Sequence, residues 1–327
     1  MKLAHLLRSE ALKPFEVLSS AATEPAWETL DITGIAFDSR RVQPGHLFVC
    51  IPGFQTDGHD YAARAVESGA VAVMVEKVLE DLPAGVPQIK VDDARCRLGH
   101  LAARFFDYPA SRLATVGITG TNGKTSTAFL CETVLSKADQ APGLIGTIRA
   151  RVGDQDRTVQ NTTPESSDLQ ELLADMVDAG NRSVVMEVSS HALALHRVAG
   201  IPFDVAVFTN LSQDHLDFHS SMEEYFETKK SLFTGLGQDW SRPAPPYAII
   251  NWDDPRAEDI LRDLKVPYIT YGFADGAHIQ ATDLEFSPEG SRFSVKTPVG
   301  DATCSLRLAG AFNVSNALAA IGVGLAR

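Results

Sequence analysis

The sequence predicts an α/β protein: a small N-terminal α/β domain followed by a larger domain with a mostly parallel sheet and a β-rich addition. Short apolar runs with the length of buried strands alternate with helix-compatible stretches, as they do in parallel α/β folds. A glycine-rich segment at residues 117–126 separates one apolar run from the next helical stretch, which is where a phosphate-binding loop occurs. From residue 279 the pattern changes to short alternating segments, which predicts the β-rich part.

The first domain is expected over residues 1–108. Three apolar runs separated by polar turns predict its strands, at residues 35–37, 47–51 and 71–75. Residues 61–68 have helical spacing. The polar segment around Pro109 breaks the pattern and predicts the domain boundary.

The second domain is expected over residues 109–327. Its predicted strands are apolar runs at residues 114–116, 183–187, 205–208 and 248–250. Helical stretches lie between them, at residues 127–135, 168–179 and 222–236. Ligands of such sheets bind at the carboxyl ends of the strands. The glycine-rich segment, Glu187, Asn210 and Asn251 each lie at the carboxyl end of a predicted strand, so we expect them on one edge of the sheet.

The composition of the chain limits which binding partners and which cellular compartment we expect. The chain has 29 Lys and Arg against 42 Asp and Glu, so its net charge of −13 argues against nucleic acid or an anionic membrane as a partner. A phosphorylated ligand must therefore meet local positive groups. No stretch approaches the roughly 18 apolar residues of a membrane span, and the N-terminus lacks the apolar core of a signal peptide. The four cysteines form no C-x-x-C pair, and we expect a cytoplasmic protein.

The glycine-rich segment carries the strongest chemical signal. Its backbone N–H groups and the following helix N-terminus would cradle a triphosphate, Lys124 would reach the outer phosphates, and the Thr125 hydroxyl would bind Mg²⁺. The alternative, an ordinary glycine-rich turn, does not explain the Gly-Lys-Thr ending. Gly117 lies one residue too far from Gly123 for the common spacing of this motif. The expected nucleotide-binding residues are Gly120, Thr121, Asn122, Gly123, Lys124, Thr125 and Ser126.

This variant loop resembles that of the Mur ligases and the folylpolyglutamate synthetases, which are ATP-dependent enzymes that join a carboxylate to an amine. Further segments resemble the MurE branch of the Mur ligases. They are Asp38-Ser39-Arg40, Asp57-Gly58-His59-Asp60, Asn161-Thr162-Thr163-Pro164, Glu187-Val188-Ser189-Ser190-His191 and residues 210–217. The resemblance extends from about residue 38 to residue 316, which is nearly the whole chain.

The resemblance implies a reaction. The MurE branch uses ATP and Mg²⁺ to add the third stem-peptide residue, meso-diaminopimelate or L-lysine, to UDP-N-acetylmuramoyl-L-Ala-D-Glu (UDP-MurNAc-dipeptide). The product is a peptidoglycan precursor, and the intermediate is an acyl phosphate. Mur ligases carry a third domain that binds the incoming amino acid, and no counterpart is present in this sequence. We therefore expect the chain alone to ligate weakly or not at all.

The resemblance also implies catalytic and metal-binding residues. The expected catalytic residues are Lys124, Glu187, His215 and Lys229, and the expected metal ligands are Thr125, Glu187, His215 and Lys229. The lysine at the last position is carbamylated in this family. Lys230 is adjacent, but helical spacing favours Lys229, because it shares one helix face with Tyr225 and Phe233.

Substrate-binding positions follow from the same resemblance. Four residues match positions that hold the uridine nucleotide: Ser39, Phe54, Gln55 and Thr56. Five match positions near the muramoyl-peptide: Asn161, Thr162, Thr163, Ser189 and Arg197. Leu195 stands where some relatives have a glutamine, so a polar contact is not expected there. Asn316 and Asn251 are candidates for contact with adenine, although asparagines at the ends of strands and helices are caps at least as often.

Two alternatives remain open. A folylpolyglutamate synthetase-like ligase shares the loop but does not explain the first domain with its Asp-Ser-Arg segment. A binding or regulatory module would hold UDP-sugar-peptide and nucleotide without turnover. The presence of Lys124, Glu187, His215 and Lys229 argues against a long-standing loss of catalysis.

Overall fold

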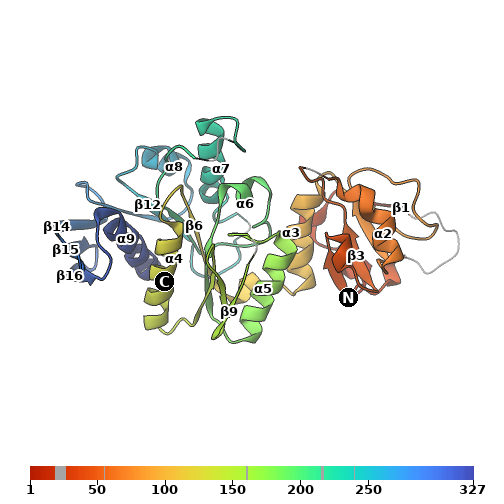
Figure 1. Cartoon of the computed structure of the whole chain (residues 1–327), viewed down its shortest axis with the longest axis horizontal. Helices are drawn as coiled ribbons and strands as arrows, with labels where there is room; N and C mark the ends of the chain where they lie inside the picture. Colours follow the sequence, from red (N-terminus) through yellow and green to blue (C-terminus); the bar gives the residue numbers. More distant parts are fainter. Residues whose placement is uncertain (19–26, 55, 160, 215–216, 239) are drawn as a thin grey trace. The chain divides into compact units, whose positions relative to one another are not determined.

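The computed structural model describes residues 1–18, 27–54, 56–159, 161–214, 217–238 and 240–327. The chain forms two compact units, each of which mixes helices and strands (Figure 1). Unit 1 comprises Met1–Pro109, Glu165–Ala174 and Leu195–Gly200, and unit 2 comprises Ala110–Pro164, Asp175–Ala194 and Ile201–Arg327. The predicted α/β class is confirmed. No helix in these ranges has the length and apolarity that a membrane span requires.

Unit 1 is built on a five-stranded sheet with the order β1-β5-β4-β3-β2. Its strands are β1 (Glu16–Leu18), β2 (Gly34–Ala36), β3 (His46–Val49), β4 (Ala72–Val75) and β5 (Gln88–Lys90). β1 is antiparallel to β5, whereas the other neighbours are parallel. The helices are α1 (Leu3–Leu6), α2 (Ala62–Glu67) and α3 (Ala94–Phe105). Short 3₁₀ turns join these elements, at Glu10–Leu12, Trp27–Thr29, Ser39–Arg41 and Gly58–Tyr61.

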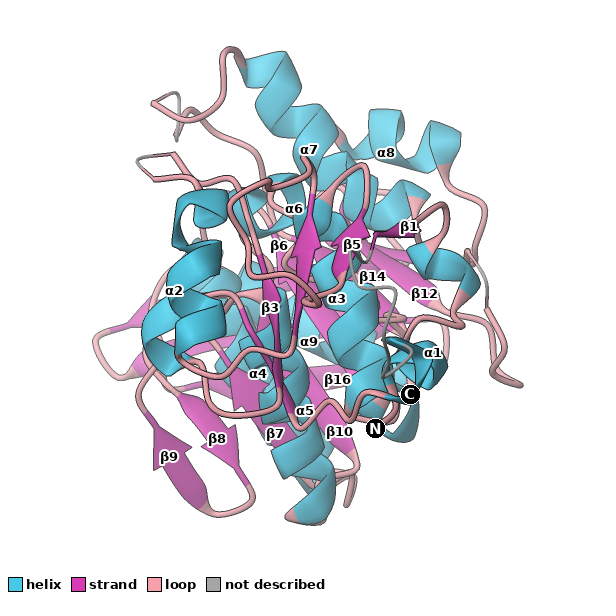
Figure 2. Ribbon diagram, turned by 90° about the vertical axis from the view of Figure 1, so that its right-hand side faces the viewer, coloured by secondary structure: helices cyan, strands magenta, loops and turns pink. Residues whose placement is uncertain are grey.

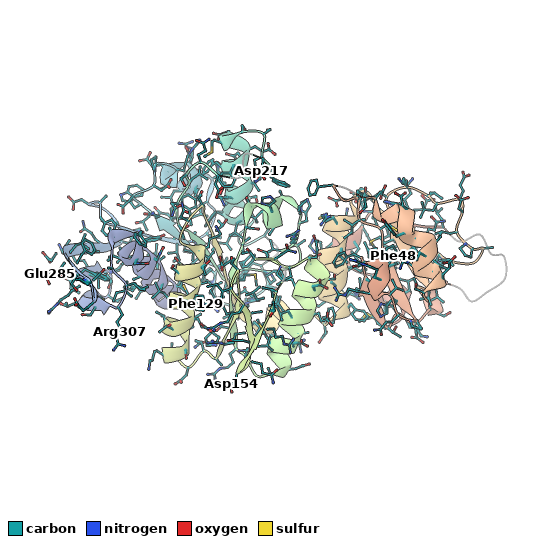
Figure 3. The ribbon with its side chains drawn as sticks, in the orientation of Figure 1. Phe48, Phe129, Asp154, Asp217, Glu285 and Arg307 are labelled. Atoms are coloured by element: carbon teal, nitrogen blue, oxygen red, sulfur yellow. The ribbon has the colours of Figure 1, made fainter. Side chains whose placement is uncertain are left out.

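Alternating side chains of β3 pack into the hydrophobic cores on the two faces of this sheet. Leu47 and Val49 join the core that contains α1 and α3, whereas Phe48 faces the core that contains α2 (Figure 3). This two-residue period is what a buried strand covered on both sides requires. The run predicted as a strand at residues 47–51 is a strand at residues 47–49, and Cys50 and Ile51 follow it as buried loop residues.

Unit 2 is built on an 11-stranded sheet with the order β16-β15-β14-β13-β12-β11-β6-β10-β7-β8-β9. The central strands are parallel: β6 (Ala114–Thr119), β7 (Pro142–Ile145), β10 (Ser183–Glu187), β11 (Val205–Phe208), β12 (Tyr247–Asn251), β13 (Tyr268–Gly272) and β14 (Ile279–Ser287). Antiparallel partners extend both ends of the sheet: β8 (Ala150–Val152), β9 (Gln155–Arg157), β15 (Gly290–Thr297) and β16 (Gly300–Leu306).

The β-rich addition predicted from residue 279 is therefore the continuation of the main sheet. Figure 2 shows β7, β8 and β9 adjacent at the other edge. Asp154, in the turn between β8 and β9, and Glu285, in β14, are both exposed on these outer parts of unit 2 (Figure 3).

Two long helices lie side by side against the unit 2 sheet (Figure 1). They are α4 (Lys124–Lys137) and α9 (Ala311–Ala326), which contact each other and the central strands. Buried apolar side chains of both, such as Cys131 and Leu318, join one hydrophobic core with residues of the central strands. The remaining helices are α6 (Ser190–Ala194), α7 (Met222–Thr234) and α8 (Ala257–Asp263), and α5 (Ser166–Asp178) contributes residues to both units. A short 3₁₀ turn at Pro109–Arg112 precedes β6.

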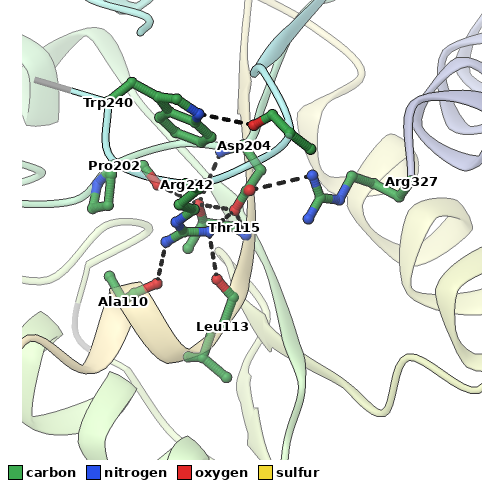
Figure 4. Close-up of polar contacts among 9 residues, drawn as sticks. Ala110, Leu113, Thr115, Pro202, Asp204, Trp240, Arg242 and Arg327 are labelled. Atoms are coloured by element: carbon green, nitrogen blue, oxygen red, sulfur yellow. Dashed lines mark hydrogen bonds and ion pairs between the residues drawn. The ribbon is translucent and has the colours of Figure 1, made fainter. Parts of the chain in front are cut away.

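A buried carboxylate ties together the amino ends of β6 and β11 (Figure 4). Asp204 is 1% exposed and accepts hydrogen bonds from the N–H of Thr115 (2.8 Å) and its hydroxyl (3.1 Å). The guanidinium groups of Arg242 and Arg327 both pair with it, the latter at 3.2 Å. Arg242 also donates to two main-chain carbonyl oxygens, those of Ala110 and Leu113. This network anchors the loop before β12 to the sheet.

Replacement of Asp204 by Ala should strongly destabilise unit 2, because it leaves two largely buried guanidinium groups without their carboxylate. We expect a loss of about 3–5 kcal/mol in the free energy of unfolding, measured by urea denaturation. Asp156 is the matched control, since it also pairs with two arginines but is 47% exposed. Asp156→Ala should cost at most about 1 kcal/mol. Equal losses for the two variants would contradict the role given to Asp204.

Candidate active site

Three neighbouring strands bring the predicted site residues together. β6 lies between β10 and β11, and all three are parallel. Glu187 pairs with Ile118 in the register, and Phe208 pairs with Thr119. The glycine-rich segment, Glu187 and Asn210 therefore lie at the same edge of the sheet, as the sequence predicted. Asn251 is the last residue of β12 at this edge and donates through Nδ2 to the carbonyl of Thr209 (2.7 Å).

The glycine-rich segment has a backbone that requires its glycines. Gly120 and Gly123 have φ angles of 144° and 86°, which disfavour other residues. A Cβ at Gly123 would lie 2.5 Å from Asn316 Oδ1, and one at Gly120 would collide with the hydroxyl of Thr209. Asn316 also accepts a hydrogen bond from Thr127 in the first turn of α4 (3.2 Å).

The loop after β11 holds this segment in place. The N–H of Thr121 donates to the carbonyl of Asn210 (2.8 Å), and the N–H of Asn122 donates to the Asn210 side chain (3.0 Å). Thr209 donates through its hydroxyl to the carbonyl of Asn122 (2.7 Å). The hydroxyl of Thr121 donates to the carbonyl of Ser212 (3.1 Å). Asn210 thus supports the phosphate loop directly.

Two lysines share one acceptor in this segment. Lys124 Nζ donates to the carbonyl oxygens of Gly120 and Thr121, both at 2.8 Å. Lys229 Nζ, from α7, donates to the same Gly120 oxygen at 2.9 Å. Burial lowers the pKa of Lys124. The structure therefore concentrates positive charge at the start of α4, which is where a phosphate group would be bound.

Lys229 is buried and has an altered acidity. It is 1% exposed, and its Nζ lies 4.4 Å from the centre of the Tyr225 ring. Burial, together with the charge of Lys124, lowers the pKa of Lys229 to about 7. Lys230 instead pairs with Asp263 at 2.5 Å, an interaction that raises the pKa of Lys230. The helical-face argument correctly placed Lys229 and not Lys230 towards the phosphate loop.

Glu187 is surrounded by hydroxyl and amide donors. Its carboxylate accepts from the Thr125 hydroxyl (2.8 Å) and from the Thr147 N–H (2.9 Å) and hydroxyl (3.3 Å). The hydroxyls of Thr147 and Thr162 are 3.0 Å apart. Thr163 donates to the Glu187 carbonyl (2.8 Å) and accepts from the N–H of Ser189 (3.3 Å). Three of the predicted muramoyl-peptide residues thus lie around Glu187.

This oxygen-rich arrangement suits Mg²⁺, because the Thr125 hydroxyl and the Glu187 carboxylate are hard ligands within hydrogen-bond distance of each other. The described residues contain no cluster of three His, Cys, Asp or Glu side chains with metal-binding geometry. His215 and Gln55, two of the predicted site residues, lie outside the described residues.

The predicted uridine-nucleotide residues lie in unit 1. Ser39 and Thr56 line a cavity of about 610 Å³, and Phe54 is 77% exposed on the same loop as Thr56. Arg197 also belongs to unit 1, where its Nε donates to Glu165 (3.0 Å). Asn161 is exposed and belongs to unit 2. The predicted substrate residues are thus divided between the units.

Sequence reasoning missed Thr147 and the bracing hydroxyl of Thr209. Thr147 follows β7, whose Pro-Gly-Leu-Ile sequence is too short and too glycine-rich to stand out as a strand. Thr209 follows β11 directly, and its position at the end of a predicted buried strand was the available signal.

A parallel sheet with a phosphate loop between β6 and α4 and a carboxylate at the end of the neighbouring strand defines a nucleotide-binding α/β protein of the P-loop type. Comparison with known families narrows the class. Residues 118–324 match the Mur ligase middle domain, and residues 31–106 match the Mur ligase family catalytic domain. The chain belongs to the Mur ligase family.

A relative from Geobacillus thermodenitrificans, named UDP-N-acetylmuramoyl-L-alanyl-D-glutamate–2,6-diaminopimelate ligase, is 46% identical over 296 residues. That match covers 90% of this chain and 60% of the relative, so the chain spans about 60% of the relative's length. A solved structure with the same enzyme name is 27% identical, has a TM-score of 0.79, and is matched over 95% of this chain and 64% of its own.

The folylpolyglutamate synthase of Mycobacterium tuberculosis, solved with ADP and AMPPCP, shares the fold. It has a TM-score of 0.59 at 16% identity, and the match covers 71% of this chain and 59% of that one.

Replacement of Lys124 by Ala should weaken ATP binding, because it removes the cation at the start of α4 and leaves the backbone cradle in place. We expect a loss of roughly 10- to 100-fold in affinity, measured by calorimetry. Lys137→Ala, at the exposed far end of the same helix, is the matched control and should bind ATP normally. ATP affinity within about threefold of wild type for Lys124→Ala would contradict the assignment.

Proposed function

We propose that the chain is the acceptor- and ATP-binding part of a ligase of the MurE branch. The reaction joins 2,6-diaminopimelate to UDP-MurNAc-dipeptide, with ATP converted to ADP and phosphate. The observation that carries this proposal is that Lys124, Glu187 and Lys229 lie around one phosphate loop in a chain 46% identical to a relative with that enzyme name. The enzyme name of that relative favours diaminopimelate over L-lysine as the added amino acid. Peptidoglycan synthesis in the cytoplasm is the corresponding location and role.

The chemistry of amide formation explains the charges. The acceptor carboxylate must attack the γ-phosphorus of ATP, and the resulting acyl phosphate is then attacked by the amine of the amino acid. Both reacting groups in the first step are anions, so cations must lie close to them. Lys124 has the position to neutralise the outer phosphates, and the N–H groups of residues 123–126, at the start of α4, would hold the remaining oxygens.

Thr125, Glu187, Lys229 and His215 are the proposed holders of Mg²⁺. Bound there, Mg²⁺ would offset the negative charge of the β- and γ-phosphates. Glu187 is oriented for this by its hydrogen bonds with Thr125 and Thr147. Thr147 is thus a positioning residue.

We further propose that unit 1, with residues 1–108 as its main segment, binds the uridine nucleotide through Ser39, Phe54, Gln55 and Thr56. Residues 109–327 would hold ATP, with Asn316 bracing the phosphate loop near the base. Asn161, Thr162, Thr163, Ser189 and Arg197 would contact the muramoyl-peptide. The hydroxyls beside Glu187 and the guanidinium of Arg197 are suitable donors for carboxylate oxygens, which supports this assignment.

Carbamylation of Lys229 is consistent with its surroundings. The reaction adds the amine to CO₂ with release of one proton, and only the neutral amine is nucleophilic. A buried lysine beside Lys124 and the Tyr225 ring is more often neutral than an exposed one. The product is an anion that Mg²⁺ and Lys124 would stabilise, whereas an ammonium group would repel both.

The carbamate should be visible by ¹³C NMR with labelled CO₂. At constant dissolved CO₂ its resonance should grow as the pH rises through about 7, because the amine of Lys229 loses its proton there. Lys229→Ala should remove the resonance. Lys230→Ala is the matched control on the same helix and should retain it, since Lys230 is ion-paired with Asp263. A resonance that persists in Lys229→Ala would contradict the proposal.

Phosphate release separates the ligase from a binding module. We expect the chain to bind ATP and UDP-MurNAc-dipeptide and to release phosphate slowly when both are present, with Lys124→Ala as the inactive control. The assay compares release with and without 2,6-diaminopimelate. Binding of both ligands without any release would favour the binding module. Release that ignores UDP-MurNAc-dipeptide would contradict the proposed substrate.

A further inference from the structure

We infer that Arg64 and Arg95 hold the diphosphate of the nucleotide-sugar in unit 1, with Glu165 as an internal carboxylate that competes for Arg95. The site is the 610 Å³ cavity, called here the arginine pocket, and its polar lining includes Ser39, Arg40, Thr56, Arg64, Arg95 and Glu165. The inference rests on the proposed function, because it assumes that the anionic ligand is a nucleoside diphosphate.

The arginine pocket contains more positive than negative charge. Arg40 is matched by Asp38, since its Nε and NH2 donate to that carboxylate at 2.9 and 2.7 Å. Arg64 is exposed on α2 and forms no ion pair with any residue that the structure describes. Because the whole chain carries a net charge of −13, this local excess is the kind of feature that a phosphorylated ligand needs.

Arg95 belongs to a cluster in which two cations share one anion. Its NH1 donates to Oε1 of Glu165 at 2.7 Å, and Arg197 Nε donates to the same oxygen at 3.0 Å. The three side chains are between 12% and 16% exposed. Glu165 Oε2 is buried and has no hydrogen-bond partner among the described residues. Two guanidinium groups thus share one carboxylate in a partly desolvated position, where a second anion is favoured.

A diphosphate fits this arrangement better than a single carboxylate. Arg64 lies on α2 and Arg95 lies in the first turn of α3, so two guanidinium groups from different helices line the pocket. A guanidinium group pairs with phosphate oxygens through two parallel hydrogen bonds, so each phosphate of a diphosphate can pair with one of the two arginines. The Ser39 and Thr56 hydroxyls in the same lining can donate to further oxygens. The volume is within the range of small-molecule pockets and exceeds what a lone phosphate needs.

Replacement of Glu165 should change the affinity for diphosphate in the opposite direction from replacement of Arg64. A phosphate that approaches Arg95 must compete with the carboxylate that already accepts from it. Loss of the Glu165 charge should therefore strengthen diphosphate binding, whereas loss of the Arg64 charge should weaken it. A purely structural role for this cluster predicts no gain in affinity from either change.

Calorimetric titration with UDP tests the inference in the whole chain. Arg64→Gln should weaken UDP binding by about 10-fold or more. Glu165→Gln should strengthen it by a few-fold at low salt, and the gain should shrink as salt is raised. Arg41→Gln is the matched control: Arg41 is an exposed arginine of unit 1 that pairs with Asp168 and lies outside the arginine pocket. It should change UDP affinity by less than about twofold.

The outcomes are distinguishable. Failure of the wild-type chain to bind UDP would overturn the proposed function and this inference with it. UDP binding that Arg64→Gln leaves within threefold of wild type would overturn the inference alone, as would equal losses in Arg64→Gln and Arg41→Gln. Thermal unfolding identifies any variant that does not fold. If Glu165→Gln fails to fold, the exposed Arg64 decides the question.

Discussion

The parallel pairing of β6 with β10 and β11 is the constraint on which the site depends. It brings three carboxyl ends to one edge, so residues far apart in sequence become neighbours there. Thr125 and Glu187 are 62 residues apart in the chain and 2.8 Å apart in space. The loop after β11 then fixes the phosphate loop through Asn210 and Thr209. A shift of one residue in this register would turn Glu187 to the opposite face and separate it from Thr125.

Main-chain carbonyl groups allow two lysines to lie close together in this framework. An ammonium group buried without a partner is costly, and a carboxylate placed there would itself repel a triphosphate. The carbonyl oxygen of Gly120 gives both Lys124 and Lys229 a hydrogen-bond acceptor. Because a carbonyl group is a dipole with no net charge, it does so without placing a negative charge near the triphosphate. Glycine is needed at position 120 for two reasons: its φ is positive, and a Cβ there would collide with the hydroxyl of Thr209.

The sequence predicted β6, β10, β11, β12 and the phosphate loop because apolar runs and the Gly-Lys-Thr ending are strong local signals. It did not predict β1, β5, β7, β8, β9 and β13, which are short or lie beside proline, glycine and charged residues. Nor did it predict that Glu165–Ala174 and Leu195–Gly200 join unit 1, because such a return of the chain has no local signature. Lys229 was found by helical spacing. Thr147 could not be found, because its role arises only from the pairing of β7 with β10.

The two units present their cations in physically different ways, although the chain as a whole is acidic. In unit 2 the cation at the phosphate loop is Lys124, which is partly buried and held by two carbonyl dipoles, so its field is strong and little screened. In unit 1 the cations are arginines, one exposed and one tied to Glu165, so their field is weaker and sensitive to salt. Phosphoryl transfer requires charges that are fixed before the reaction. Binding of a part of the substrate that does not react has no such requirement. On the proposed function, the fixed Lys124 would lie at the reacting phosphates, and the adjustable arginines would lie at a diphosphate that takes no part in the chemistry.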